Sequence, residues 1–172
     1  MNNNTFVHKY IRSLIHEDDT VVDMTAGNGN DTLFLSSLAG KVYAFDTSAE
    51  AIDRCRKKLQ GVHNVILIHD THSRFDTYVR EPVRLFLFNL GFLPNSDDIS
   101  LTEAEETLRA FRKAYSFLNE NDYIVITFYL GHPGGKDEFY LLEDYMKKNR
   151  IPVLEMYRQD KTDSPVTYII RK

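Results

Sequence analysis

The sequence predicts an α/β fold whose mostly parallel sheet is covered by helices on both faces. Short apolar runs alternate with longer amphipathic segments along the whole chain, and polar residues follow most of the apolar runs. Alternating strands and helices form βαβ units, which place helices on both sides of a parallel sheet. Ligands bind such a sheet at the carboxyl ends of its strands, so the residues after each strand are the first candidates for function.

Seven apolar runs have the length and residue types of strands. In chain order, these runs are Thr20–Met24, Lys41–Phe45, Val65–Ile68, Val83–Phe88, Tyr123–Tyr129, Pro152–Arg158 and Pro165–Ile170. Segments with a helical spacing of apolar residues lie before and between them. The predicted helices are Val7–Ile15, Thr32–Leu38, Ala49–Leu59, Thr102–Leu118 and Glu138–Lys148. Ser48 is the expected N-cap of the third helix, and Thr102, with Glu105 in the first turn, is that of the fourth.

The composition is typical of one globular domain spanning residues 1–172, with 42% hydrophobic and 27% charged residues. The net charge of −4 argues weakly against a nucleic-acid partner. Cys55 is the single cysteine, which excludes an internal disulfide, and we expect no metal centre. No signal peptide and no apolar run of roughly 20 residues is visible, so we expect a cytoplasmic protein without a membrane span.

The turn after the first predicted strand is the first candidate site. Gly27 and Gly29, one residue apart, let the backbone pass close to a ligand. The third glycine of a dinucleotide-binding turn and the lysine of a phosphate-binding loop are both absent, which disfavours a dehydrogenase. Asp23, Asn28 and Asp31 suit a ligand that presents cations and hydroxyl groups. A tight turn without a ligand is the alternative.

Asp46 ends the second predicted strand, 19 positions after Gly27. An acidic residue at about this distance binds ribose hydroxyls in nucleotide-binding α/β folds. Capping of the next helix is the alternative role, although Thr47 and Ser48 already offer side chains for that purpose.

Asp70, Thr71 and His72 follow the third predicted strand. Asp70 is placed to accept a hydrogen bond from an adenine amino group, and Thr71 or His72 to line the same pocket. The residues alone are nearly as consistent with a surface turn.

The fourth and fifth strands run into segments that suit a substrate. Asn89 carries donor and acceptor groups where cofactor and substrate would meet, Gly91 allows close approach, and Pro94 stiffens the exit. After the fifth strand, Tyr129 can stack on a base or orient an amine. His132 can take up a proton near neutral pH, although a structural histidine fits the pattern equally well.

Together these segments resemble a bacterial methyltransferase family, formerly described as rRNA methylases. The run Val22–Thr32 resembles the family motif VDxTxGNGxDT, while Asn89–Pro94 and Tyr129–Gly135 are similar to its NLGxLP and GHxGG motifs. With Phe45-Asp46 and His69-Asp70, the match covers nearly the whole chain in the family's order. The resemblance implies a Rossmann-like class I fold and S-adenosylmethionine as cofactor. It also implies N-methylation of the aminomethyl group of 5-aminomethyl-2-thiouridine at the tRNA wobble position.

The resemblance also implies roles for individual residues. The expected cofactor site comprises Thr25, Gly27, Asn28, Asp31, Asp46, Thr47, Asp70, Thr71, His72 and Asn89. The expected substrate side comprises Leu90, Gly91, Phe92, Pro94, Gly134 and Gly135, and the expected catalytic groups are Asn89, Tyr129 and His132. The implied partner is the anticodon region of tRNA, and a homodimer is left open. Methylation of rRNA or of a small amine, and a non-catalytic cofactor-binding subunit of an RNA-modifying complex, are the alternatives.

Overall fold

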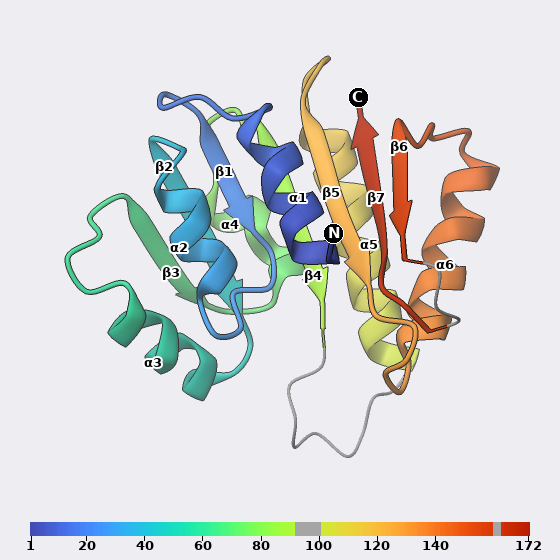
Figure 1. The fold of residues 1–172 in the computed structure, drawn as a ribbon, viewed down its shortest axis with the longest axis horizontal. Helices are drawn as coiled ribbons and strands as arrows, with labels where there is room; N and C mark the ends of the chain where they lie inside the picture. Colours follow the sequence, from blue (N-terminus) through green and yellow to red (C-terminus); the bar gives the residue numbers. More distant parts are fainter. Residues whose placement is uncertain (92–100, 160–162) are drawn as a thin grey trace.

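A single seven-stranded sheet organises the chain, as a computed structural model describes it for residues 1–91, 101–159 and 163–172 (Figure 1). The strands are β1 (Thr20–Asp23), β2 (Lys41–Asp46), β3 (Val65–His69), β4 (Leu85–Leu90), β5 (Tyr123–Phe128), β6 (Glu155–Arg158) and β7 (Val166–Arg171). Their order across the sheet is β3-β2-β1-β4-β5-β7-β6. Strands β1 to β5 pair in parallel, whereas β7 runs antiparallel to β5 and β6. The predicted mostly parallel sheet is confirmed.

Helices cover both faces of this sheet (Figure 1). They are α1 (Asn3–Arg12), α2 (Asn30–Ser36), α3 (Ala49–Lys58), the short α4 (Phe75–Tyr78), α5 (Leu101–Phe117) and α6 (Gly135–Lys148), with the 3-10 turn η1 (His72–Arg74) before α4. Helices α1 and α2 pack on one face, and α5 and α6 on the other. Strands β2 and β3 follow β1 on one side of it. After β3 the chain crosses to the other face and continues in β4, which lies on the other side of β1, so the strand order reverses between β1 and β4. That reversal is where doubly wound sheets bind ligands.

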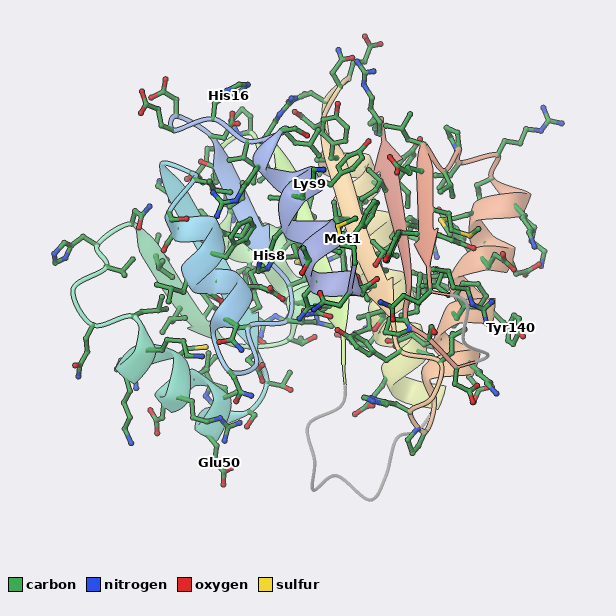
Figure 2. All side chains as sticks on the ribbon, viewed as in Figure 1. Met1, His8, Lys9, His16, Glu50 and Tyr140 are labelled. Atoms are coloured by element: carbon green, nitrogen blue, oxygen red, sulfur yellow. The ribbon has the colours of Figure 1, made fainter. Side chains whose placement is uncertain are left out.

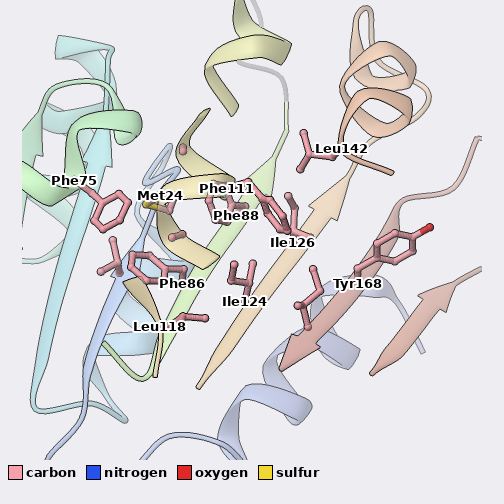
Figure 3. Close-up of a cluster of buried hydrophobic side chains, with 14 of the residues drawn as sticks. Met24, Phe75, Phe86, Phe88, Phe111, Leu118, Ile124, Ile126, Leu142 and Tyr168 are labelled. Carbon is pink, nitrogen blue, oxygen red and sulfur yellow. The ribbon is translucent and has the colours of Figure 1, made fainter. Parts of the chain in front are cut away.

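Aromatic side chains anchor the strand that runs through this reversal (Figure 3). Phe86 and Phe88 of β4 are fully buried, and the Phe86 ring meets that of Phe75 edge to face at 4.8 Å. Each buried ring of this size contributes roughly 1.5–3 kcal/mol through the surface it removes from water. Leu142 of α6 and Phe111 of α5 close the same core. The ends of β1, β4 and β5 are therefore held on a rigid base.

Several element boundaries differ from the predictions. Helix α1 begins earlier than Val7, because the Asn2 side chain caps it by accepting a hydrogen bond from the Thr5 amide at 2.8 Å. Helix α5 begins at Leu101, so Thr102 lies inside the first turn and is not the cap. Ser48 does cap α3, since its side chain accepts from the Ala51 amide.

Two further differences concern the starts of helix α6 and strand β6. Helix α6 begins at Gly135 because Gly134 takes a left-handed conformation with φ of 75°. Strand β6 begins only at Glu155, not at Pro152, whose ring leaves no N–H for a ladder. The turn η1 and helix α4 were not predicted. No helix in the described ranges combines the length and apolarity needed to cross a membrane.

Candidate active site

A cavity of about 500 Å³ opens at the carboxyl ends of β1, β2, β4 and β5. Most residues predicted for the site line it. They are Thr25, Gly27, Asn28, Asp31, Asp46, Thr47, Thr71, His72, Asn89, Leu90, Gly91, Tyr129, His132, Gly134 and Gly135. The topology thus brings together segments that are distant in sequence.

Three predicted residues are not placed in this cavity. Phe92 and Pro94 lie outside the described residues. Asp70 is not among the lining residues; its carboxylate accepts a hydrogen bond from the Tyr78 hydroxyl at 2.7 Å and pairs with Arg74 at 2.9 Å. The Tyr78 hydrogen bond is the main reason why the pKa of Asp70 lies below its usual value. In this structure the Asp70 carboxylate is therefore engaged by Tyr78 and Arg74.

The glycine-rich turn is clamped from below by Asp23. This fully buried carboxyl accepts hydrogen bonds from the Thr25 amide at 3.1 Å and the Thr32 hydroxyl at 2.6 Å, one at each end of the turn. Burial, followed by the nearby Asp31, raises the pKa of Asp23 to about 7. Gly29 has φ of 75°, and a Cβ there would lie 3.0 Å from the Cys55 sulfur. The turn therefore has one tightly held conformation.

Asp46 holds the turn from the side and caps the next segment. One carboxylate oxygen accepts the Gly27 amide at 2.8 Å, and the other accepts the Ser48 amide at 2.8 Å. The bond to the Ser48 amide, at the N-cap of α3, agrees with the role at the start of the next helix, and ribose binding stays a prediction. Each carboxylate oxygen has a second lone pair, so Asp46 retains acceptor capacity toward the cavity that it lines.

His72 presents a buried nitrogen with no protein partner. Its Nε2 atom is shielded from solvent and makes no hydrogen bond, while a backbone hydrogen bond with Met24 engages the ring. Since Nε2 is unpartnered, that bond involves Nδ1, which then carries the proton. Burial lowers the pKa of His72 below its usual value, which favours the neutral ring. Nε2 is consequently an unpaired acceptor in a residue that lines the cavity.

Asn89, at the end of β4, is hydrogen-bonded to residues on both sides of the turn after β1. Its backbone amide donates to the Thr25 hydroxyl at 2.8 Å, and its side-chain nitrogen donates to Asp31 at 2.7 Å. The other Asp31 oxygen lies 2.8 Å from Nε2 of His8 on α1. The side-chain oxygen of Asn89 is buried and has no partner. Sequence reasoning missed His8, because nothing near it in the chain reveals a partner 23 positions away.

Carboxylates from α5 and α6 form the opposite wall of the cavity, and sequence reasoning missed these too. They are Glu103, Glu106, Asp137 and Glu138. Glu138 accepts the Thr107 hydroxyl at 2.6 Å, and burial, with a further contribution from Glu103, raises its pKa to about 7. One signal was available: Glu138 lies four positions before the buried Leu142, on the core-facing stripe of its helix.

Tyr129 and His132 form an aromatic lip over the cavity. Their rings stack with centroids 5.4 Å apart. Burial and the Asp31 carboxylate raise the pKa of Tyr129, while a hydrogen bond from Asn89 acts in the opposite sense. Gly135 must be glycine in this geometry, because a Cβ there would lie 2.2 Å from the Tyr129 carbonyl oxygen. The start of α6 therefore packs directly against the lip.

Comparison with known sequences finds two kinds of relative. Residues 42–172 match the sequence model of a family described as “Putative rRNA methylase”. The chain is 34% identical over 154 residues to the “tRNA (mnm(5)s(2)U34)-methyltransferase, chloroplastic” of Arabidopsis thaliana, covering 80% of this chain and 56% of that protein. It is 32% identical over 89 residues to the “Ribosomal RNA small subunit methyltransferase H” of Tropheryma whipplei, covering 49% of this chain and 28% of that protein. The chain thus spans about half, or less, of these relatives.

Solved structures match the whole fold. A “putative methyltransferase” from Streptococcus mutans in complex with SAH superposes with a TM-score of 0.87 and 32% identity, over 100% of this chain and 99% of the other. A “putative rRNA-methylase” from Clostridium thermocellum superposes with a TM-score of 0.86 and 34% identity, over 100% and 98% of the two chains. The Rossmann-like class I fold predicted from the sequence is confirmed.

Proposed function

This chain belongs to the family described as “Putative rRNA methylase”, and from that membership we propose that it is an S-adenosylmethionine-dependent methyltransferase that N-methylates an amine in tRNA. The proposed substrate is the aminomethyl group of 5-aminomethyl-2-thiouridine at the wobble position. The observation that carries this proposal is the buried, unpartnered oxygen of Asn89 in a cavity walled by carboxylates. An acceptor in acidic surroundings suits a cationic amine. The similarity to the chloroplast tRNA methyltransferase over 80% of this chain supports the choice of RNA.

The residues of the cavity fit the cofactor. When bound, S-adenosylmethionine supplies an electrophilic methyl group on a sulfonium. The tight turn at Gly27 and Asn28 allows close backbone approach, and Asp46 has lone pairs left for two ribose hydroxyls. His72 offers its buried acceptor nitrogen, and it lines the cavity, whereas Asp70 does not. The acidic lining also suits a positively charged ligand.

Asn89 is the residue proposed to hold the amine. Its free oxygen accepts an N–H of the substrate, which directs the nitrogen lone pair toward the methyl group. The new nitrogen–carbon bond forms as the carbon–sulfur bond breaks, and the sulfur keeps the bonding electrons. The amine enters largely protonated and loses one proton before attack. We assign that proton to Glu138, whose pKa of about 7 suits a base near neutral pH. Tyr129, with its raised pKa, stays a phenol and acts as a donor.

The lip is proposed to receive the base from the RNA. Sequence-specific proteins hold splayed single-stranded bases by stacking them on aromatic rings. Tyr129 and His132 offer such a surface, and the backbones of Leu90, Gly91 and Gly134 lie in the same lining. An anticodon loop presents its wobble base in a form that this lip can accept.

Methyl transfer to isolated tRNA tests the proposal. Purified protein and isotope-labelled S-adenosylmethionine are incubated with tRNA that carries unmethylated 5-aminomethyl-2-thiouridine, and the nucleosides are analysed by mass spectrometry. We expect labelled 5-methylaminomethyl-2-thiouridine, and at least a hundredfold less product from Asn89→Ala. Parallel reactions contain rRNA or a free primary amine. Labelling of rRNA or of the free amine without labelling of tRNA would overturn the substrate, and tight SAH binding with no transfer to any acceptor would overturn the enzymatic function.

A further inference from the structure

The orientation of the Asn89 amide is set by its neighbours. Its side-chain nitrogen donates to one oxygen of Asp31 at 2.7 Å and also lies near the Tyr129 hydroxyl, toward which it acts as a donor. A carboxylate can only accept hydrogen bonds, so the nitrogen end of the amide must face Asp31. The oxygen end is then the part left over, and it is the buried atom without a partner. Asp31 therefore determines that the acceptor end of the Asn89 amide faces away from Asp31, in a residue that lines the cavity.

Asp31 is itself held by a residue outside the cavity lining. Nε2 of His8 lies 2.8 Å from the carboxylate oxygen that does not contact Asn89. The His8 imidazole stacks on Phe34 of α2, with centroids 3.7 Å apart and planes 4° apart, which fixes the direction of Nε2. The side chain of Asp31 is only 15% exposed, so this charge is poorly hydrated and depends on its protein donors. Figure 2 shows His8 on α1, beside α2.

We propose that His8 is a positioning residue for methyl transfer: it holds Asp31, and Asp31 keeps the Asn89 amide turned so that its oxygen receives the N–H of the substrate amine. The proposal rests on the proposed function, because the amine is the ligand of that oxygen. It connects α1, at the start of the chain, to the end of β4 through two hydrogen bonds. Without His8, Asp31 can swing toward solvent, and the amide loses the partner that sets its orientation.

Four variants separate positioning from structure. His8→Ala removes the donor, whereas His8→Gln keeps an amide donor in its place. Asn89→Ala removes the last member of the chain, and the fourth variant combines His8→Ala with Asn89→Ala. His16→Ala is the matched control, since His16 is an exposed histidine of the same N-terminal segment. The SAH dissociation constant, kcat and KM are measured for each protein.

We expect His8→Ala to lower kcat about tenfold, because an Asn89 oxygen that points the wrong way no longer aligns the substrate amine with the methyl group. Its SAH dissociation constant stays within about twofold of the wild-type value, and His8→Gln recovers most of kcat. In the Asn89→Ala background, His8→Ala adds less than about twofold, since residues that act through one another are not additive. An unchanged kcat in His8→Ala, a fully additive double variant, or a loss of SAH affinity equal to the loss of kcat would each overturn the proposal.

The orientation of the Asn89 amide can also be measured by NMR, without a catalytic assay. In ¹⁵N-labelled protein, the side-chain NH₂ signals of Asn89, assigned by their loss in Asn89→Ala, report its hydrogen bonds. We expect them to shift or broaden in His8→Ala and to stay in place in His16→Ala. Unchanged signals in His8→Ala would refute the positioning role. A wild-type protein that binds SAH but methylates no amine would sink the proposed function, while these signals still decide whether His8 orients Asn89.

Discussion

The cavity has two walls: the first is formed by the turn after β1 and by Asp46, and the second by Asn89 of β4 and the carboxylates of α5 and α6. A carboxyl group with a raised pKa lies at each wall, in different surroundings. Asp23, below the turn after β1, is fully buried and has a pKa of about 7, and it accepts hydrogen bonds at both ends of that turn. Glu138, on α6, also has a pKa of about 7, but it lines the cavity. Burial is the main cause of the shift in both residues. Burial therefore raises the pKa of one carboxyl group that holds the backbone of a turn and of another that lines the cavity.

The difference extends to the groups around each carboxyl. At the first wall, Asp23 accepts a hydrogen bond from the Thr25 amide, and Asp46 accepts one from the Gly27 amide. Both bonds fix the backbone of the turn. On the β4–α6 side, the oxygen of Asn89 is left without a partner. A satisfied polar network gives rigidity, whereas an unsatisfied buried acceptor is costly unless a ligand completes it. We propose that the first wall, together with the unpartnered nitrogen of His72, holds the cofactor and that the second wall meets the reacting group.

The largest effect should come from breaking the rigid wall. Asp23→Ala leaves the Thr25 amide and the Thr32 hydroxyl without acceptors, which should cost about 2–4 kcal/mol in the free energy of unfolding. For a chain of this length, that loss lowers the melting temperature by roughly 8 °C. Calorimetry on Asp23→Ala and on the exposed control Asp18→Ala checks this expectation. Asp23→Asn keeps the shape and one acceptor and should lose less than half as much; equal losses in both Asp23 variants would show that one acceptor contributes nothing and that both carboxylate oxygens are required.

The rigid wall was also the part most accessible to sequence reasoning. The turn between β1 and α2 contains its candidate site residues close together in the chain, and Asp46 lies at a spacing that nucleotide-binding folds share. The seven strands followed from apolar runs, because residues buried on both faces of a parallel sheet must be apolar. Local patterns of this kind are visible without any knowledge of the fold.

Contacts between distant segments were the part of the site that the sequence did not reveal. His8 meets Asp31 only after α1 packs beside α2, and Glu138 meets Thr107 only after α6 packs on α5. Nothing in a single sequence indicates these partners. Asp70 is a different case: its position after β3 suggested an adenine contact, but its carboxylate is hydrogen-bonded to Tyr78 and paired with Arg74, and Asp70 is not among the residues that line the cavity. Position along the chain fixes where a side chain begins, while its neighbours decide where it points.

Cofactor affinity should distinguish the two walls. Asp46→Ala removes the proposed ribose acceptor and frees the Gly27 amide, so the SAH dissociation constant should rise about a hundredfold, as for the loss of one or two charge-assisted hydrogen bonds. Glu138→Ala should change it less than threefold. Isothermal titration calorimetry with SAH measures both constants. Similar losses in the two variants would mean that the cofactor spans both walls, and our division of the cavity would be wrong.

The pH dependence of transfer should report on Glu138. A base with a pKa of about 7 is mostly protonated below that pH, so the rate should rise with pH up to about 7 and then level off. Glu138→Gln should lower the rate about tenfold or more at neutral pH and leave only the rise that follows the pKa of the amine itself. Single-turnover rates between pH 5.5 and pH 9, about the range in which this enzyme would stay folded, provide the comparison.

The same substitution should change stability with the opposite sign. The pKa of Glu138 is raised on folding, so its contribution to stability is fully present below its unfolded value and is lost as the pH rises through about 7. Glu138→Gln removes that loss and should be more stable than the wild type at pH 8. A variant that is slower and also less stable at pH 8 would indicate a structural role for Glu138.

The smallest effect should come from the outer edge of the second wall. His132 is exposed and stacks on Tyr129, and of these two rings Tyr129 is the one that is hydrogen-bonded to Asn89. If Glu138 accepts the proton, His132→Ala should raise KM for tRNA about threefold, as for the loss of part of one stacking contact, without altering the pH profile. His132→Phe keeps the ring and should restore KM. A pH profile that changes in both variants would instead make His132 the proton relay that the sequence suggested, and it would move the chemistry from the cavity wall to the lip.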